Sequence, residues 1–214
     1  MWSSDVNLEA KMLDMERLMQ NFLIGKRVYL RGLSPKEMGE DSPYLSWLND
    51  LSLDLYTERS YFPNTIEKIQ SYYDHAHQNT DLLLLGIFDI ETDTHIGNIT
   101  MSEINMFHKR GFIAYLLGDK NFNGKGLTTD ACLMLMYYAF NKLNFERVDG
   151  GVSDIHPASR RVCEKVGLMV EGRQKHHVLR NGIWHDRLIV GAIREEWLSK
   201  FGKKAIDCFE TLPC

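Results

Sequence analysis

Hydrophobic residues near the start of the chain recur at spacings that alternate between four and three: Leu8, Met12, Met15, Met19 and Phe22. Such spacing places them on one stripe of a helix. We therefore predict an amphipathic helical extension over residues 1–25. Two interpretations of the stripe stay open, because it can pack on its own domain or form a homodimer contact.

Short apolar runs bounded by turn residues predict strands in the next part of the chain, at residues 27–33, 82–88, 95–101 and 111–117. Two helices are predicted between the first and second of these strands. Ser34 and Glu37 form a capping-box pattern for one helix, and Asn64 with Glu67 repeats that pattern for the other. The last three strands favour an antiparallel meander.

The pattern changes after residue 117, where strands and helices alternate. We expect a glycine-bearing loop at 118–126, helices at 127–143 and 157–167, and strands at 147–152, 168–180 and 183–193. Asn181-Gly182 is the strongest hairpin signal. The element order predicts one mixed α/β (α+β) domain over residues 26–198, followed by a tail over 199–214.

Composition narrows the class of protein. The chain has 44% hydrophobic and 25% charged residues and a net charge of −4, which is typical of a soluble globular protein and disfavours a nucleic-acid partner. No apolar run approaches the roughly 20 residues that span a bilayer, and no secretory signal is visible. The four cysteines lie far apart without zinc spacing, so we expect reduced thiols, a cytoplasmic location and no metal.

The most informative stretch runs from Leu117 to Leu127, where a strand ends, glycines follow and an apolar helix begins. Backbone N–H groups at a helix start bind phosphate or pyrophosphate, and glycines allow close approach. A dinucleotide fingerprint would need glycine at position 129, where Thr129 stands. A P-loop would need Ser or Thr at position 126, where Gly126 stands.

Asn121, Gly124 and Gly126 occupy the places of the Gln/Arg-x-x-Gly-x-Gly/Ala signature of the GNAT acetyltransferase superfamily. The stretch from Ser159 to Leu168 resembles that family's second motif, and the resemblance covers about residues 27–197. It implies a mostly antiparallel sheet of about seven strands flanked by helices. The family's fourth and fifth strands, here 111–117 and 147–152, would be splayed, and acetyl-CoA would be the cosubstrate.

The resemblance also implies a set of residues that contact acetyl-CoA. Backbone amides of the glycine loop would hold the pyrophosphate, and a backbone N–H near a bulge at Leu116 or Leu117 would stabilise the oxyanion. The residues expected to contact acetyl-CoA are Leu116, Leu117, Asn121, Phe122, Asn123, Gly124, Lys125, Gly126, Leu127, His156 and Ser159.

Acyl transfer from a thioester to an amine needs a proton acceptor, because an alkylammonium has a pKa near 10.4. We expect Glu103 as the base and His108 as a proton relay, although either one is also readable as a surface residue. The family's usual tyrosine position holds Cys163. Cys163 or Ser159 is therefore the candidate acid, with core packing and helix capping as their respective alternatives.

The acceptor side is predicted from aromatic and charged residues. Trp47 and Trp184 are candidates to stack on an acceptor, with core packing as the alternative for each. Asp186 and Arg173 are candidates to bind the acceptor, and the alternative for Asp186 is a structural ion pair with Arg173, Arg180 or Arg187. By resemblance to two branches of the superfamily, we expect a small-molecule amine, most specifically a nucleotide-linked amino sugar of the pseudaminic-acid type. The alternatives are a protein N-terminal amine, as in ribosomal-protein acetyltransferases, and a non-catalytic acyl-CoA-binding module.

Overall fold

The computed structural model describes residues 21–52 and 62–213. Its strands are β1 (Leu23–Gly25), β2 (Val28–Arg31), β3 (Leu83–Asp89), β4 (His95–Asn105), β5 (Arg110–Leu117), β6 (Arg147–Ser153), β7 (Met169–Arg180), β8 (Ile183–Ile193) and β9 (Phe209–Thr211). Its helices are α2 (Pro35–Met38), α3 (Pro43–Asn49), α4 (Ile66–Gln78), α5 (Leu127–Asn141), α6 (Pro157–Val166) and α7 (Arg194–Ile206), with a 3₁₀ turn η2 at Lys120–Phe122.

All nine described strands form one sheet, in the order β7-β8-β6-β5-β4-β3-β2-β1-β9. Neighbouring strands are antiparallel except for β5 and β6, which run parallel. The mostly antiparallel α/β fold is therefore confirmed. The expected count of about seven strands is low because β1 and β9 add one short strand each.

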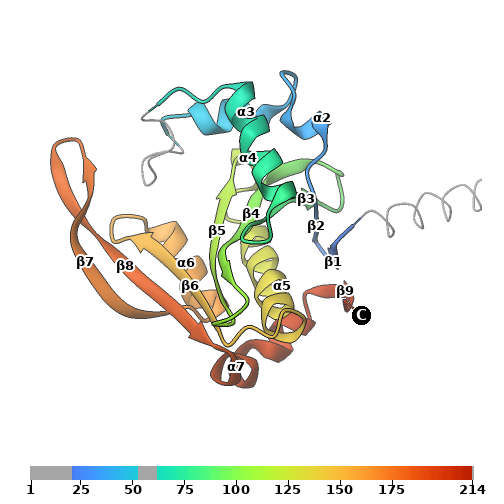
Figure 1. Ribbon diagram of the computed structural model, residues 1–214, viewed down its shortest axis with the longest axis vertical. Helices are drawn as coiled ribbons and strands as arrows, with labels where there is room; N and C mark the ends of the chain where they lie inside the picture. Colours follow the sequence, from blue (N-terminus) through green and yellow to red (C-terminus); the bar gives the residue numbers. More distant parts are fainter. Residues whose placement is uncertain (1–20, 53–61, 214) are drawn as a thin grey trace, which may run out of the picture.

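The sheet opens between β5 and β6. These strands pair only where Arg110–Phe112 faces Arg147–Asp149, although both strands continue beyond that point. Figure 1 shows them diverging toward the upper part of the molecule. The predicted splay is thus confirmed, and no described strand pairs with the β6-facing edge of the C-terminal half of β5.

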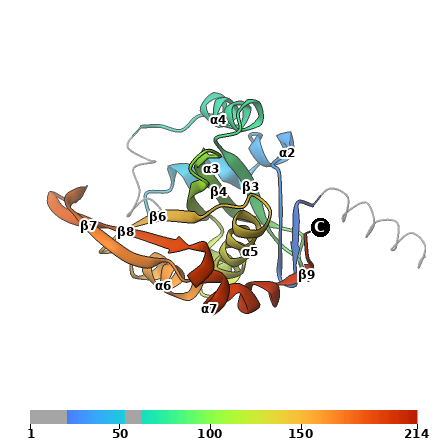
Figure 2. The ribbon, with the colours of Figure 1, turned by 60° about the horizontal axis from the view of Figure 1, so that its bottom comes forward.

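Helices cover both faces of the sheet, with α2–α4 on one side and α5–α7 on the other (Figures 1 and 2). The main core lies under α5, where the stretch Ala131–Met136 is almost wholly excluded from solvent. A second apolar cluster fills the space between α2–α4 and the sheet and includes Tyr44, Trp47, Leu48 and Ile69. Across the described ranges, no helix combines the length and apolarity needed to cross a bilayer.

Both predicted ends of the domain differ in the structure. Residues 1–20 of the expected helical extension lie outside the described residues, and Leu23–Gly25 is a strand rather than a helix. At the other end, α7 continues past residue 198, and β9 pairs with β1 at the sheet edge. Phe209 is buried, so residues up to 211 pack as part of the domain.

Candidate active site

The glycine loop adopts the geometry that its sequence requires. Gly124 and Gly126 have φ angles of +75° and +81°, and Gly126 caps the N-terminus of α5 in the left-handed region. An L-residue loses about 1–2 kcal/mol in that conformation, so glycine is favoured at both positions. Apart from its two chain neighbours, no described residue has an atom within 4 Å of the place where a Gly124 side chain would begin, so the backbone there is open to a ligand.

The backbone amides of the glycine loop fall into two groups, one hydrogen-bonded within the loop and one without acceptors in the described chain. The amides of Asn121, Phe122 and Asn123 donate to Asp119 Oδ1, Asp119 O and Lys120 O, respectively. In the described chain, no protein group accepts a hydrogen bond from the amides of residues 124–127. The free donors at the helix start therefore begin at Gly124, and this run fits a pyrophosphate.

Arg27 braces the loop from behind, and sequence reasoning missed it. Its Nη1 donates to the carbonyl oxygen of Lys125 (2.9 Å), and its Nε donates to Asp130 Oδ2 (2.7 Å) in the first turn of α5. By holding this carbonyl on its own side, Arg27 favours the loop conformation that leaves the neighbouring amides open. The charge pairing links residues far apart in sequence, so no local motif reveals it.

The two loop lysines differ in their environment. Lys120 pairs with Asp50 Oδ2 (2.7 Å) and donates to Ser52 Oγ (2.8 Å), which ties the loop to the end of α3. Lys125 Nζ lies 4.5 Å from the centre of the Phe122 ring. Lys125 has no carboxylate partner among the described residues and is the one placed to add positive charge beside the open amides.

The backbone of β5 also presents a donor at the open edge. Gly118 donates its N–H to Ile96 O (2.9 Å), and Leu117 faces Gly97 in the register with β4. In an antiparallel ladder this makes Gly97 and Leu117 a non-hydrogen-bonded pair. The N–H of Leu117 therefore points away from β4, toward the gap beside β6, whereas that of Leu116 points to β4.

The bulge expected near Leu116 or Leu117 is absent from the β4–β5 register there. The register shift between these strands lies instead between Ser102 and Asn105. The open donor at Leu117 thus arises from the loss of β6 as a partner, not from an extra residue in the strand.

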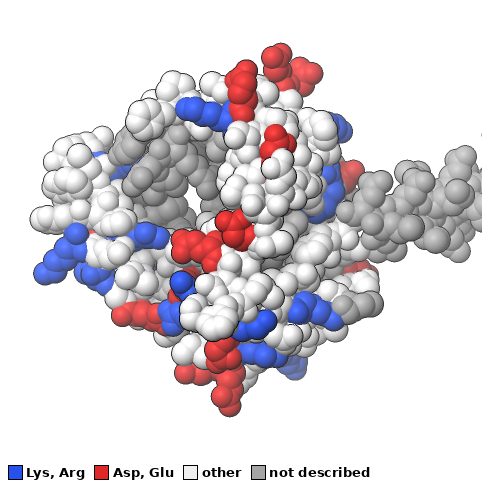
Figure 3. All heavy atoms as spheres, in the orientation of Figure 1, with Lys and Arg blue, Asp and Glu red and all other residues white. Residues whose placement is uncertain are grey.

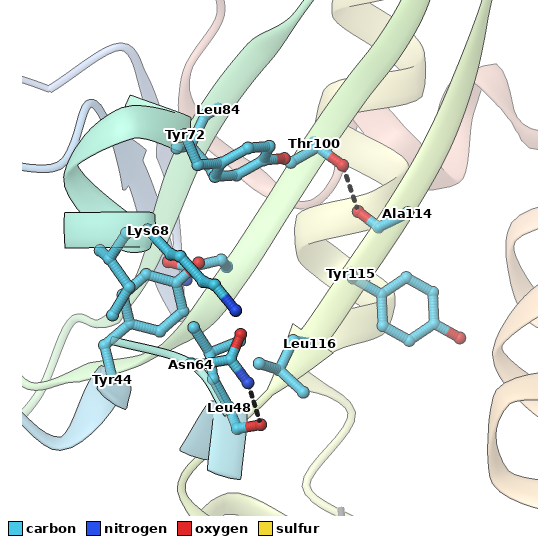
Figure 4. Close-up of a pocket in the computed structure, with 12 residues that line it drawn as sticks. Tyr44, Leu48, Asn64, Lys68, Tyr72, Leu84, Thr100, Ala114, Tyr115 and Leu116 are labelled. Carbon is cyan, nitrogen blue, oxygen red and sulfur yellow. Dashed lines mark hydrogen bonds between the residues drawn. The ribbon is translucent and has the colours of Figure 1, made fainter. Parts of the chain in front are cut away.

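A cavity of about 330 Å³ lies beside the open end of β5, between the sheet and α3–α4. Its lining includes the aromatic side chains of Tyr44 and Tyr72 and the ammonium group of Lys68. Figure 4 shows Lys68, Asn64 and Leu116 around one space, while the side chain of Tyr115 points away from them. In Figure 3 this face is hollowed between helices α2–α4 and the β7–β8 hairpin, which we call the β7–β8 arm.

Tyr115 reaches from β5 to α6 on the opposite side of the sheet. Its hydroxyl oxygen is 2.8 Å from Ser159 Oγ, and the two groups share a hydrogen bond. Burial raises the pKa of Tyr115 well above its usual value, so the phenol stays protonated. Sequence reasoning identified Ser159 but missed Tyr115, because nothing local in the sequence shows which way this strand residue points.

Cys163 packs in the core and His156 caps a helix, so both have a structural role. Cys163 is 6% exposed within the main core, and burial raises the pKa of its thiol to about 11. His156 is the N-cap of α6, where its Nδ1 faces the amide of Ser159 at 3.5 Å. Burial lowers the pKa of His156, which favours the neutral ring that a cap acceptor needs.

The structure does not bring the predicted base and relay to this cavity. Glu103 is exposed and lies in the β4 bulge with a φ of +51°. It is five residues further along β4 than Asn98, which lines the cavity, and this separation corresponds to about 16 Å at about 3.3 Å per residue. His108 is exposed in the β4–β5 turn, against Phe107. Both residues lie at the end of the hairpin where β5 and β6 are still paired.

Trp47 packs in the core rather than stacking in the cavity. It is 8% exposed, its ring lies against His95 at 5.1 Å between centroids, and a side chain on Gly118 would begin 1.9 Å from it. The core alternative therefore holds for this residue. Trp47 supports the strand end that leads into the glycine loop.

The other three predicted acceptor residues lie on the β7–β8 arm. Arg173 Nη1 pairs with Asp186 Oδ2 (2.8 Å) and with Asp154 Oδ2 (3.3 Å). The hydrogen bond from Arg173 contributes most to lowering the pKa of Asp186. Trp184 is 53% exposed with its ring stacked on His176, so the structural ion-pair alternative describes Arg173 and Asp186, and Trp184 stays outside the cavity.

Comparisons with known proteins agree with this geometry. A family model described as an acetyltransferase (GNAT) domain matches residues 27–169. The probable N-acetyltransferase YjcK of Bacillus subtilis (strain 168) is 30% identical over 179 residues, covering 81% of this chain and 98% of that protein. The putative ribosomal N-acetyltransferase YdaF of the same organism is 32% identical over 101 residues, covering 47% of this chain and 55% of that protein.

Among solved structures, spermidine N-acetyltransferase from Vibrio cholerae in complex with CoA and spermine matches with a TM-score of 0.72. At 18% identity, over 80% of this chain and 98% of that one, the likeness is one of fold. The chain belongs to the GNAT acetyltransferase family. It is an acetyl-CoA-dependent N-acetyltransferase, as the sequence predicted.

Proposed function

We propose that this enzyme acetylates a small-molecule primary amine, most specifically the amino group of a nucleotide-linked amino sugar. The cavity beside β5 carries the proposal. At about 330 Å³ it falls in the lower range of small-molecule sites, and it is lined by tyrosines and a lysine. A protein N-terminus would need room for an extended chain, which favours an open groove over a cavity of this size.

The nucleotide part of such an acceptor would extend beyond the cavity. Lys and Arg side chains gather over β7 and β8 in Figure 3. Arg187 of β8 lies 5.6 Å from the centre of the Phe112 ring, where β5 and β6 part. This position is suited to a diphosphate at the edge of the gap.

The chemistry is assigned to groups at the gap. Acetyl-CoA supplies the acetyl thioester, and the open amides of residues 124–127 are suited to its pyrophosphate. The N–H of Leu117 is assigned to hydrogen-bond the acetyl carbonyl oxygen, on which negative charge develops. The Tyr115–Ser159 hydroxyl pair is placed to donate a hydrogen bond to the departing sulfur.

Proton removal from the amine is assigned to water. Among the residues that the structure describes around the cavity, no carboxylate or histidine contributes to the lining. A water chain through the open gap can carry the proton to solvent. This differs from the expected role of Glu103, whose position is too far along β4.

The test measures thiol release from acetyl-CoA with three groups of amines: amino-sugar nucleotides, N-terminal peptides that include ribosomal-protein sequences, and spermidine. We expect the amino-sugar nucleotides to give the highest kcat/KM. A Glu103→Gln variant should retain most of the wild-type rate. A preference for peptides would overturn the proposed acceptor and support the ribosomal alternative.

A further inference from the structure

We infer that the acceptor carries an anionic oxygen group, a carboxylate or a phosphate, that is bound by Lys68 and Asn98. The inference rests on the proposed function, because it concerns the acceptor cavity. Lys68 is the charged residue in the described lining, and no described carboxylate balances it. A group of opposite charge is therefore favoured in this space.

Asn98 provides an independent observation. It is 4% exposed, it lines the cavity, and its Nδ2 has no hydrogen-bond partner in the described parts of the chain. A buried donor without a partner costs about 1–3 kcal/mol. An acceptor oxygen that reaches Asn98 would satisfy this donor.

His95 fixes the direction of that amide. Its Nε2 is 2.9 Å from Asn98 Oδ1, and its ring is buried between Phe88 and Trp47. Burial lowers the pKa of His95, so the ring is neutral near pH 7. When the neutral ring donates from Nε2 to Oδ1, the amide nitrogen of Asn98 is turned away from His95 and left without a partner among the described residues. His95 is therefore a positioning residue.

Lys68 supplies the charge at the mouth. It lies in the first turn of α4 and is exposed, and its Nζ donates to Pro63 O (2.6 Å). An ammonium has three donors, so one hydrogen bond to Pro63 leaves two for a ligand. Figure 4 shows Lys68 extending toward the space beside Asn64 and Leu116.

The arrangement sorts amines by charge. An amine with a carboxylate or phosphate places its anionic oxygens on Lys68 and Asn98 and its amino group toward β5. A polyamine would bring a second positive charge to Lys68 and leave the Asn98 donor unpaired. We therefore expect polyamines to be poor acceptors, in contrast to the relative crystallised with spermine.

Equilibrium binding tests the inference without turnover. D-glucosamine 6-phosphate is compared with D-glucosamine, and β-alanine with β-alaninamide, so that the phosphate and carboxylate sources are separated. Wild type should bind at least one anionic amine about tenfold or more tightly than its uncharged counterpart, as expected for a charge-assisted hydrogen bond. Lys68→Met should remove that preference, and the control Lys200→Met on α7 should keep it.

The Asn98 variants test the direction of the donor. Asn98→Asp should weaken binding of the anionic amine more than Asn98→Ala does, because a carboxylate repels the ligand. His95→Gln should weaken binding less than Asn98→Ala. Thermal melting identifies any variant that fails to fold, and Lys68→Met still decides the question because Lys68 is exposed.

The outcomes separate the two proposals. Equal binding of charged and uncharged amines, tighter binding of spermidine, or an anion preference that survives Lys68→Met would each overturn the inference. Acetylation of uncharged small amines would then leave the proposed function standing. Conversely, an anion preference lost in Lys68→Met, together with acetylation of peptides only, would support the anion site and overturn the proposed acceptor.

Discussion

At the scale of single residues, Arg27 shows how a side chain far from the glycine loop in sequence prepares that loop for its ligand. The guanidinium holds the Lys125 carbonyl and Asp130 together, on the side away from the open amides. The loop is thus ordered before the ligand arrives, which reduces the entropy cost of binding.

Replacing Arg27 by Ala should weaken acetyl-CoA binding about tenfold, because hydrogen bonds from a charged donor contribute about 1.5–3 kcal/mol. Calorimetric titration with acetyl-CoA measures the effect. Lys26→Ala is the matched control, since it removes a neighbouring charge whose side chain does not support the loop. An unchanged Kd in Arg27→Ala would show that the loop needs no brace.

The phenol of Tyr115 gives a second prediction at this scale. Tyr115→Phe should lower kcat about tenfold or more while leaving the Kd for acetyl-CoA nearly unchanged, because it removes a donor needed only as charge develops on sulfur. Tyr137→Phe on α5 is the control. Equal kcat values for the two variants would assign Tyr115 to packing alone, and Ser159→Ala should reproduce part of the loss.

At the scale of elements, local patterns predicted most of the structure. The Asn181-Gly182 turn has positive φ at both residues, and Gly167 ends α6 in the left-handed region, as their sequence positions indicated. The helix behind the glycine loop was also found from its apolar run. These features depend on residues close together in sequence, which is why they could be predicted.

The roles of Glu103 and His108 could not be predicted in the same way. Both residues belong to the β4–β5 hairpin, as expected, but its register places them at the end away from the cavity. That outcome depends on a bulge at Ser102–Asn105 and on where β6 stops pairing. Neither is a property of the local sequence, and the direction of Asn98 likewise required knowledge of its neighbour His95.

The short strands β1 and β9 escaped prediction because a strand of three residues carries no periodic signal. Phe209 of β9 nevertheless packs into the core, with its ring 5.6 Å from that of Tyr137. Phe209→Ala should lower the free energy of unfolding by about 3–5 kcal/mol, measured by denaturant titration. Leu212→Ala, at an exposed neighbour, should change it by less than about 0.5 kcal/mol. Similar values for both would indicate a loosely attached tail.

At the scale of the whole molecule, the β7–β8 arm shows why charge clusters are hard to interpret from sequence. Arg173 was a candidate to bind the acceptor, but its guanidinium is paired with Asp186 and Asp154. These acidic partners come from β8 and from the loop after β6. The positive charge of the arm is therefore smaller than the number of basic residues along β7 suggests. A homodimer contact, through the N-terminal helical extension or through the C-terminal strands, is a further prediction from the sequence.

Stability against acid depends on Glu37, which links β2 to α2. Burial alone would raise the pKa of this carboxyl, but hydrogen bonds from Arg31 and Ser34 outweigh it and lower the pKa to about 2. The folded protein therefore binds fewer protons than the unfolded chain between these pKa values. The stabilisation is present above about pH 4.5 and is lost as the pH falls toward 2.

The variant Glu37→Gln should be less stable than wild type by about 2 kcal/mol near pH 6, and the difference should shrink as the pH falls below 4.5. Denaturant titrations at a series of pH values measure it. Glu40→Gln, on the exposed loop after α2, serves as the control. A difference that stays constant from pH 6 to pH 2.5 would rule out this linkage.

The parting of β5 from β6 has a mechanical consequence. The two halves of the sheet share a short stretch of ladder, and the arm of coenzyme A carries amide groups of its own. Acetyl-CoA bound in the gap would hydrogen-bond to β5 and β6 as a strand does, and it would thereby join the two halves of the sheet. Hydrogen exchange at Ile113–Leu117 should therefore slow when acetyl-CoA is added, while exchange in β3 stays the same. The sheet would be most rigid in the complex with acetyl-CoA, just before acetyl transfer, and it would become more flexible when CoA dissociates.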